Sequence, residues 1–189
     1  MDGTPAEVFE WLHDEAVVMW CLTFVEAVGA DDVLAAFGAE PLGEPASWAT
    51  LPVNASERGS GVRVAPLGRW SLAIELESIL GSGERVLRGL SRGGRALNLL
   101  RTGSGLELVQ YWVRGELVCG FEPGMEESRG GAAPDALLGD MAAVGMVSGS
   151  GREAEAPVEA PFLLARRLTG ITADRALVLG SAWPAGIAG

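Results

Sequence analysis

The chain has 189 residues, of which 48% are hydrophobic and 21% are charged. This length fits a single domain, and the hydrophobic content supplies a sizeable core, which excludes a chain that is disordered throughout. The 25 acidic and 14 basic side chains give a formal net charge of −11. That charge repels phosphate backbones and anionic lipids, so we expect no nucleic-acid binding and no membrane binding. It would attract a basic protein partner, although the simpler interpretation is that it keeps the protein soluble.

The start of the sequence shows no export signal. Residues Met1 to Pro5 lack the basic start and the apolar run of a signal peptide. The longest apolar stretch, residues 16–25, is about half as long as a membrane-spanning helix. Cys21 and Cys119 lie in apolar, strand-like segments and are expected to be buried reduced thiols, with a disulfide as the alternative. We therefore expect a cytoplasmic protein.

The first third of the chain predicts two helices around one buried strand. A capping box over residues 4–7 begins the first helix. Residues 17–25 are apolar on both pleat faces, which is typical of a central strand covered on two sides. A second helix is expected over residues 32–37. The proline- and glycine-rich residues 39–61 then predict a long loop.

An alternating segment follows this loop. Residues 69–77 place apolar side chains on one side and Glu75 and Glu77 on the other, which is typical of a half-buried strand. We expect it to pair antiparallel with residues 62–66. The two carboxylates would lie about 7 Å apart on a solvated face. As an alternative, paired carboxylates could serve glycoside chemistry or bind a divalent cation.

The rest of the chain alternates between turn residues and periodic apolar segments. Residues 148–157, rich in serine, glycine and charge, are typical of a flexible linker. The other expected elements are, in chain order, a helix that Ser82 caps, strands over 95–101, 106–113 and 116–122, a helix from Pro134, helical segments over 161–168 and 172–179, the second capped by Thr172, and a frayed end over 181–189.

This order of elements predicts an α+β fold, with a mainly antiparallel sheet of about five strands and helices packed on it. The composition divides the chain into three parts. Residues 1–147 form an α+β core domain, residues 148–157 form the linker, and residues 158–180 form a C-terminal helical segment that packs on the core.

Several short segments occur together in a recognisable order. They are Trp20-Cys21-Leu22-Thr23-Phe24-Val25, Gly68-Arg69-Trp70-Ser71-Leu72-Ala73-Ile74-Glu75, Leu90-Ser91-Arg92-Gly93-Gly94-Arg95, Gly115-Glu116-Leu117-Val118 with Phe121-Glu122-Pro123, and Pro134-Asp135-Ala136-Leu137 with Gly145. Over roughly residues 11–180 the chain resembles an uncharacterised family of small proteins from high-GC bacteria, a domain of unknown function. The resemblance implies membership but no activity, because that family has no established catalytic residues. Arginine as the sole basic residue type besides one histidine fits a GC-rich genome.

No motif predicts a metal site, a cofactor or a catalytic residue. His13 is the only histidine, and without a second histidine or a cysteine cluster it cannot complete a zinc site. Ser104 and Ser150 lie in turns rather than in a nucleophile elbow. Gly81-Ser82-Gly83 precedes a helix but lacks the lysine of a phosphate-binding loop, and Glu84 stands where an anion would dock.

Four residues are the candidate binding residues. Arg92 and Arg95 flank two glycines and could clamp a carboxylate or phosphate, or could tie this loop to Glu75. Trp48 interrupts the long loop and could anchor a partner or pin the loop to the core.

Two hypotheses for function follow. The first is a non-enzymatic protein-interaction domain, such as an adaptor or an immunity-type, defence-associated protein. The second is a small-ligand sensor or a cryptic enzyme that uses Glu75, Arg92 and Arg95 in a cleft. Convergence of these side chains in a pocket would favour the second, and an exposed apolar patch would favour the first.

Overall fold

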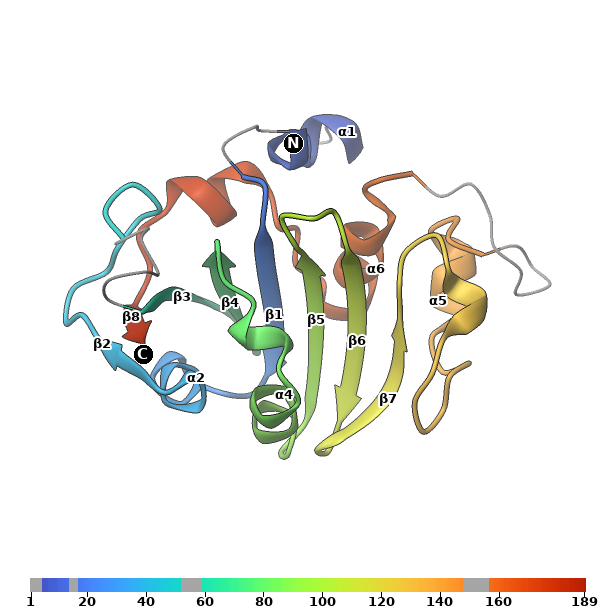
Figure 1. Cartoon of the computed structure of the whole chain (residues 1–189), viewed down its shortest axis with the longest axis horizontal. Helices are drawn as coiled ribbons and strands as arrows, with labels where there is room; N and C mark the ends of the chain where they lie inside the picture. Colours follow the sequence, from blue (N-terminus) through green and yellow to red (C-terminus); the bar gives the residue numbers. More distant parts are fainter. Residues whose placement is uncertain (1–4, 14–16, 52–58, 148–156) are drawn as a thin grey trace.

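An antiparallel sheet organises the fold. The computed structural model describes residues 5–13, 17–51, 59–147 and 157–189, and within them the sheet has eight strands (Figure 1). Neighbouring strands follow the order β2-β8-β3-β4-β1-β5-β6-β7. The bounds are β1 (Trp20–Glu26), β2 (Ala39–Pro41), β3 (Ser60–Leu67), β4 (Trp70–Leu76), β5 (Arg95–Arg101), β6 (Glu107–Val113), β7 (Glu116–Phe121) and β8 (Ala185–Ala188).

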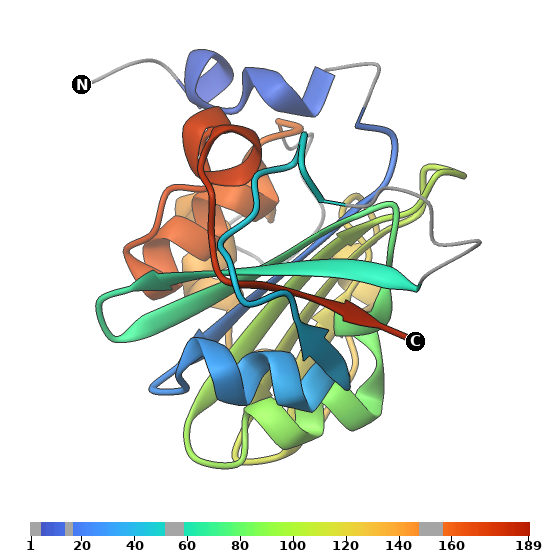
Figure 2. The same ribbon diagram turned by 90° about the vertical axis from the view of Figure 1, so that its left-hand side faces the viewer.

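Short helices cover the two faces of the sheet. The face against which α2 and α4 pack is called the front face, and α5 and α6 lie on the opposite, back face (Figures 1 and 2). The helices are α1 (Pro5–Val8), α2 (Ala30–Phe37), α4 (Glu84–Leu90), α5 (Leu138–Ala143) and α6 (Ala160–Thr169), with 3-10 turns η1 (Glu10–His13), η2 (Leu80–Ser82) and η3 (Glu126–Ser128), and a π-helical turn η4 (Ala176–Gly180). No helix among these residues is long and apolar enough to cross a membrane.

Strand β1 lies between β4 and β5 and is buried along its whole length. Its alternate side chains serve two cores. Trp20, Leu22 and Phe24 belong to the main core on the back face, whereas Val25 packs with residues of α2 and α4 on the front face. The expected central strand covered on both sides is therefore confirmed from Trp20 onward. Its apolar pattern is continuous because both of its faces are buried in a core.

An aromatic cluster in the main core joins residues near the N-terminus to α6. The ring centroids of Trp11 and Trp20 lie 6.0 Å apart, and those of Trp20 and Phe162 lie 5.1 Å apart. Phe9 packs on Phe162 at 5.3 Å. The rings meet in tilted and edge-to-face arrangements, which aromatic quadrupoles favour. Residues near the N-terminus, β1 and α6 thus share one core.

The sheet is larger than the sequence predicts, with eight strands rather than about five. The expected long loop over 39–61 contains β2, and the expected frayed end over 181–189 contains β8. Strand β8 pairs with β2 on one side and with β3 on the other, so that Ala188 lies opposite both Ala39 and Ser60. These strands are three and four residues long, and their pairing is set by tertiary contacts rather than by an alternating pattern.

Two helix starts also differ from expectation. Ser82 ends η2, and Gly83 stands at the N-cap of α4. In the last helical segment Arg175, rather than Thr172, stands at the N-cap of η4, and the nearby Asp174 Oδ1 accepts a hydrogen bond from the Leu177 N–H at 2.8 Å. The expected linker, apart from Pro157, and Thr4 of the capping box lie outside the described residues. The division into core, linker and C-terminal segment stays a prediction.

Candidate functional site

The front face of the sheet is open over β6 and β7. Leu87 of α4 covers Trp112, the last front-facing side chain of β6, together with Ala96 of β5. Beyond that contact, Leu108 and Leu117 are only half-buried. Leu106, which immediately precedes β6, is 46% exposed. Apolar side chains therefore line a part of the sheet that no described helix covers.

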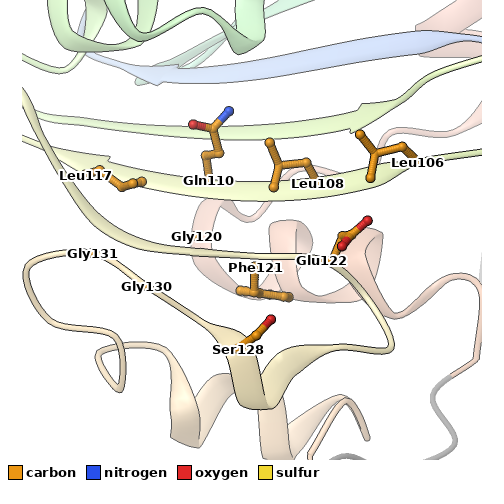
Figure 3. Close-up of a pocket in the computed structure, with 10 residues that line it drawn as sticks. All are labelled: Leu106, Leu108, Gln110, Leu117, Gly120, Phe121, Glu122, Ser128, Gly130 and Gly131. Carbon is orange, nitrogen blue, oxygen red and sulfur yellow. The ribbon is translucent and has the colours of Figure 1, made fainter.

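A pocket of 440 Å³ hollows this open face (Figure 3). Its lining is mainly apolar and comes from β6, β7 and the segment that follows β7. The lining residues are Leu106, Leu108, Gln110, Leu117, Gly120, Phe121, Glu122, Ser128, Gly130 and Gly131. In Figure 3 the side chains of Leu106, Leu108 and Gln110 stand in a row along one strand, and residues 128–131 form the wall beyond Gly120.

A second hollow of 610 Å³ continues the first towards α4. The two share Leu108, Gln110 and Leu117, and the second adds Glu84 and Arg88 of α4. We call the joint trough the β6–β7 groove; its lining is that of the first pocket together with Ser82, Glu84, Arg88, Trp112, Gly115 and Glu116. Its floor from residue 106 to residue 112 is about 20 Å long at the rise of an extended strand.

Hydrogen bonds fix the one polar side chain in the middle of the floor. Gln110 Nε2 donates to the carbonyl of Ser82 at 3.0 Å, and Gln110 Oε1 accepts from the indole N–H of Trp112 at 3.4 Å. Gln110 stands opposite Gly120 on β7, where no side chain rises from the floor. The polar floor position is therefore preorganised, and the neighbouring position is low enough for a ligand to approach the backbone.

The far wall depends on glycine. Gly120 and Gly130 exchange two backbone hydrogen bonds of 2.8 and 2.9 Å, which hold residues 130–131 against β7. Gly131 has a φ of +123°, and a Cβ there would lie 2.4 Å from the carbonyl oxygen of Val118. A side chain at this position would push the wall away from β7.

The charged side chains of the groove are mostly carboxylates. Glu116 and Glu122 line it without an ion pair in the described part of the chain, whereas Arg88 pairs with Glu84 at 2.5 Å. Among the lining residues the ionisable side chains are carboxylates and one arginine, and none forms a nucleophile–base pair. Such an arrangement can bind a ligand through apolar contacts and charge.

Glu75 is buried rather than solvent-facing, and this corrects the expectation of a half-buried strand, since β4 is covered on both faces. Its Oε1 accepts hydrogen bonds from the Ser78 hydroxyl at 2.6 Å and the Leu80 N–H at 2.9 Å, and its Oε2 accepts one from the Gly81 N–H at 2.8 Å. Burial raises the pKa of this carboxyl above 4.5, against the lowering effect of these donors. Glu75 anchors η2 to the sheet.

A polar cluster surrounds Glu75 on the front face. Asn98 Nδ2 donates to Cys21 Sγ at 3.1 Å and to Thr23 Oγ1 at 2.9 Å, and all three side chains are fully buried. A Cβ on Gly81 would lie 2.5 Å from Thr23 Oγ1 and 2.6 Å from Glu75 Oε2, so η2 closes tightly over the cluster. Burial and the Glu75 carboxylate raise the pKa of the Cys21 thiol, which is therefore unreactive.

The structure does not bring Glu75 together with the two candidate arginines. Arg95 binds Glu26 through its Nε at 2.6 Å, its Nη2 lies 2.8 Å from the same carboxylate, and Arg69 is a further partner of Glu26. Glu75 stands opposite Cys21, five residues or about 17 Å along β1 from Glu26. Arg92 is exposed, with its Cγ near the turn at Gly115. The loop is tied to Glu26 rather than to Glu75.

Trp48 is partly buried and packs against the main core. It lies near the bridge between Ala46 and Trp183, which joins the 39–51 segment to the segment before β8. These contacts pin the loop, whereas a role of Trp48 in binding stays a prediction.

Sequence reasoning missed the β6–β7 groove. One signal for it was present, because Leu106, Leu108, Gln110 and Trp112 alternate along β6 and form a mostly apolar second face. Without the positions of α2 and α4, nothing in the sequence says that this face stays partly open while the equivalent face of β1 is covered.

Comparison with known proteins gives one match. A family model described as "Family of unknown function (DUF6461)" matches residues 4–189. Neither the curated proteins nor the solved structures contain a match. Because the family model spans nearly the whole chain, the protein belongs to the family of unknown function DUF6461.

Proposed function

We propose that the protein is a non-enzymatic protein-interaction domain that docks a partner in the β6–β7 groove. One observation carries the proposal, namely that α2 and α4 leave the front face open over β6 and β7, where Leu106, Leu108 and Leu117 line a trough. Open apolar surface of this kind marks interaction sites in soluble proteins. An adaptor or an immunity-type neutralising protein would use such a surface without chemistry.

The origin of the protein and the charge of its partner are part of the same proposal. Arginine as the only strongly basic residue type supports an origin in a high-GC bacterium. The net charge of −11 supports a basic partner and disfavours nucleic acid and anionic membranes as partners.

A small-ligand sensor is the second candidate, and the size of the hollows favours it. Volumes of 440 and 610 Å³ fall within the range of small-molecule sites. The site of such a sensor would be the groove, because Glu75 is sealed under η2 and Arg95 is engaged by Glu26.

Site-specific photo-crosslinking tests the proposed function. A photoreactive amino acid replaces Leu106 in one variant and Leu42 in a matched control, because Leu42 is 43% exposed but lies beside β2 at the other edge of the sheet. We expect one protein to crosslink in the native host through position 106 and not through position 42. Equal crosslinking at both positions, or none at 106, would contradict docking in the groove.

A further inference from the structure

The charged side chains that line the β6–β7 groove differ between its two ends. Glu122 lines one end beside Leu106, and no basic side chain is among the lining residues of that hollow. The other end is lined by Glu116 and by the ion pair of Glu84 with Arg88. The groove therefore has a direction, with a negative end at Glu122 and an end of mixed charge at α4.

The floor between these ends is apolar and accessible. Leu106 is 46% exposed, and Leu108 and Leu117 are half-buried. Met125, in the turn that follows Glu122, is 53% exposed. Covering these side chains removes apolar surface from water, which is the main driving force for association. A ligand that combines apolar groups with a positive charge at the Glu122 end would match the groove along its length.

A second copy of this chain is a poor occupant. Two copies each carry a net charge of −11 and repel each other. The negative end of the groove would face another acidic surface, and like charges brought together in an interface cost several kcal/mol. The occupant required by charge complementarity is therefore a different, basic molecule.

We propose that the groove binds an extended segment of a partner protein, in which apolar side chains lie on Leu106, Leu108 and Leu117 and a Lys or Arg pairs with Glu122. This proposal rests on the proposed function and adds the chemistry of the partner. At the rise of an extended strand, about six or seven residues span the floor. Apolar contacts supply most of the affinity, and the ion pair fixes the direction of the segment.

Selection of short peptides tests this chemistry independently of the native partner. Random seven-residue peptides displayed on phage are selected on the full-length protein, and the recovered peptides are measured by fluorescence anisotropy. We expect them to join apolar residues to a terminal Lys or Arg. Leu106→Asp should weaken their binding about tenfold or more. Glu122→Gln should weaken it about three- to tenfold and remove most of its salt dependence.

Matched controls come from the opposite edge of the sheet. Glu40 lies in β2 and Leu42 follows it, so Glu40→Gln and Leu42→Asp should leave peptide affinity unchanged. Thermal melts of all four variants check that they fold. Recovery of no peptide, of peptides without a basic residue, or of peptides that bind Leu106→Asp as tightly as the parent protein would overturn the proposal. Self-association that Leu106→Asp abolishes would assign the groove to a second copy and would also overturn it.

The two proposals fail differently. If a native protein crosslinks through position 106 but the selected peptides lack a basic residue, docking in the groove stands and the proposed partner chemistry fails. If no protein crosslinks through position 106, the proposed function fails, whatever peptides the selection yields.

Discussion

The burial of Glu75 depends on the path of the chain after β4. Glu75 follows a clean alternation of apolar and polar side chains, which predicts a solvated position. In the fold, the chain after β4 turns back and places the N–H groups of Leu80 and Gly81 on that carboxylate. The covering segment follows the strand by only a few residues. Since no local pattern encodes a chain reversal onto the front face, burial of Glu75 could not be predicted.

Two tryptophans test where the core lies. Trp20→Ala removes a fully enclosed ring that packs edge-to-face on Phe162, so we expect a loss of about 3–5 kcal/mol in the free energy of unfolding. Trp48 is partly buried, and Trp48→Ala should cost about 1–2 kcal/mol. Denaturant unfolding of the two variants measures both values.

Trp20→Phe is the matched control for Trp20→Ala. The indole N–H of Trp20 is buried with no partner among the described residues, so a phenylalanine removes an unsatisfied donor while keeping an aromatic ring. It should cost less than the alanine variant. A Trp48→Ala protein that unfolds as early as Trp20→Ala would show that the 39–51 segment belongs to the rigid core.

The Glu26 carboxylate predicts a pH dependence. Its hydrogen bond from Arg95, with the charges of Arg95 and Arg69, holds the pKa of Glu26 below 4.5 despite partial burial. A lowered pKa in the folded state stabilises the fold above the unfolded value, and this contribution is lost as the pH falls through the folded value. Glu26→Gln should therefore cost most near neutral pH, roughly 1–2 kcal/mol after allowance for solvent screening at the partly exposed Arg95.

Unfolding of Glu26→Gln and the parent protein across acid and neutral pH measures this effect. The difference between them should shrink below pH 4.5. Arg92→Gln is the control, because Arg92 is exposed and forms no ion pair with Glu26 among the described residues. A difference that grows as the pH falls would contradict the assigned ion pair.

At the scale of elements, strands with a local signature could be predicted and those without one could not. The hairpin of β3 and β4 and the turn at Arg114-Gly115 between β6 and β7 follow from alternation and turn chemistry, and both are confirmed. Strands β2 and β8 exist because the C-terminal segment lies between residues 39–41 and β3 in the fold. Ala185 and Ala188 are buried there although their segment contains mostly small residues without alternation.

Arg63 shows how the C-terminal segment is held. This buried guanidinium donates to the carbonyl of Val178 at 2.6 Å and approaches that of Ser181 at 3.5 Å, and burial lowers its pKa to about 10. The carbonyls at the end of η4 carry the partial negative charge of a helix C-terminus, which suits a cation. An arginine, a residue type that is mostly exposed in proteins, thus fixes the path of the chain into β8.

Deletion of residues 182–189 tests the contribution of β8. The truncated chain loses the strand between β2 and β3 and exposes both of its neighbours. With about 1 kcal/mol for each lost ladder hydrogen bond, we expect at least about 3 kcal/mol of destabilisation by denaturant unfolding. Deletion of the exposed Gly189 alone is the control and should change little. Equal stability of the two truncations would contradict a structural role for β8.

At the scale of the whole molecule, charge and shape lead to one expectation about assembly. The edge of the sheet at β7 is covered by residues 130–133, since Ala132 and Ala133 donate to the Leu117 and Val118 carbonyls at 2.9 Å. Together with a net charge of −11, this protects the purified protein from edge-to-edge pairing. Sedimentation at low salt should show a monomer, and a dimer that low salt strengthens would contradict this account.

Docking of a partner in the β6–β7 groove is most directly tested by hydrogen–deuterium exchange on the complex with the crosslinked native partner. Backbone amides of Leu106–Trp112 and Glu116–Glu122 should exchange more slowly in the complex than in the free protein, while those of β2 and β8 stay unchanged. Slower exchange confined to the segment around Trp48 or to β2 and β8, with the groove unaffected, would contradict the assignment of the groove as the binding site.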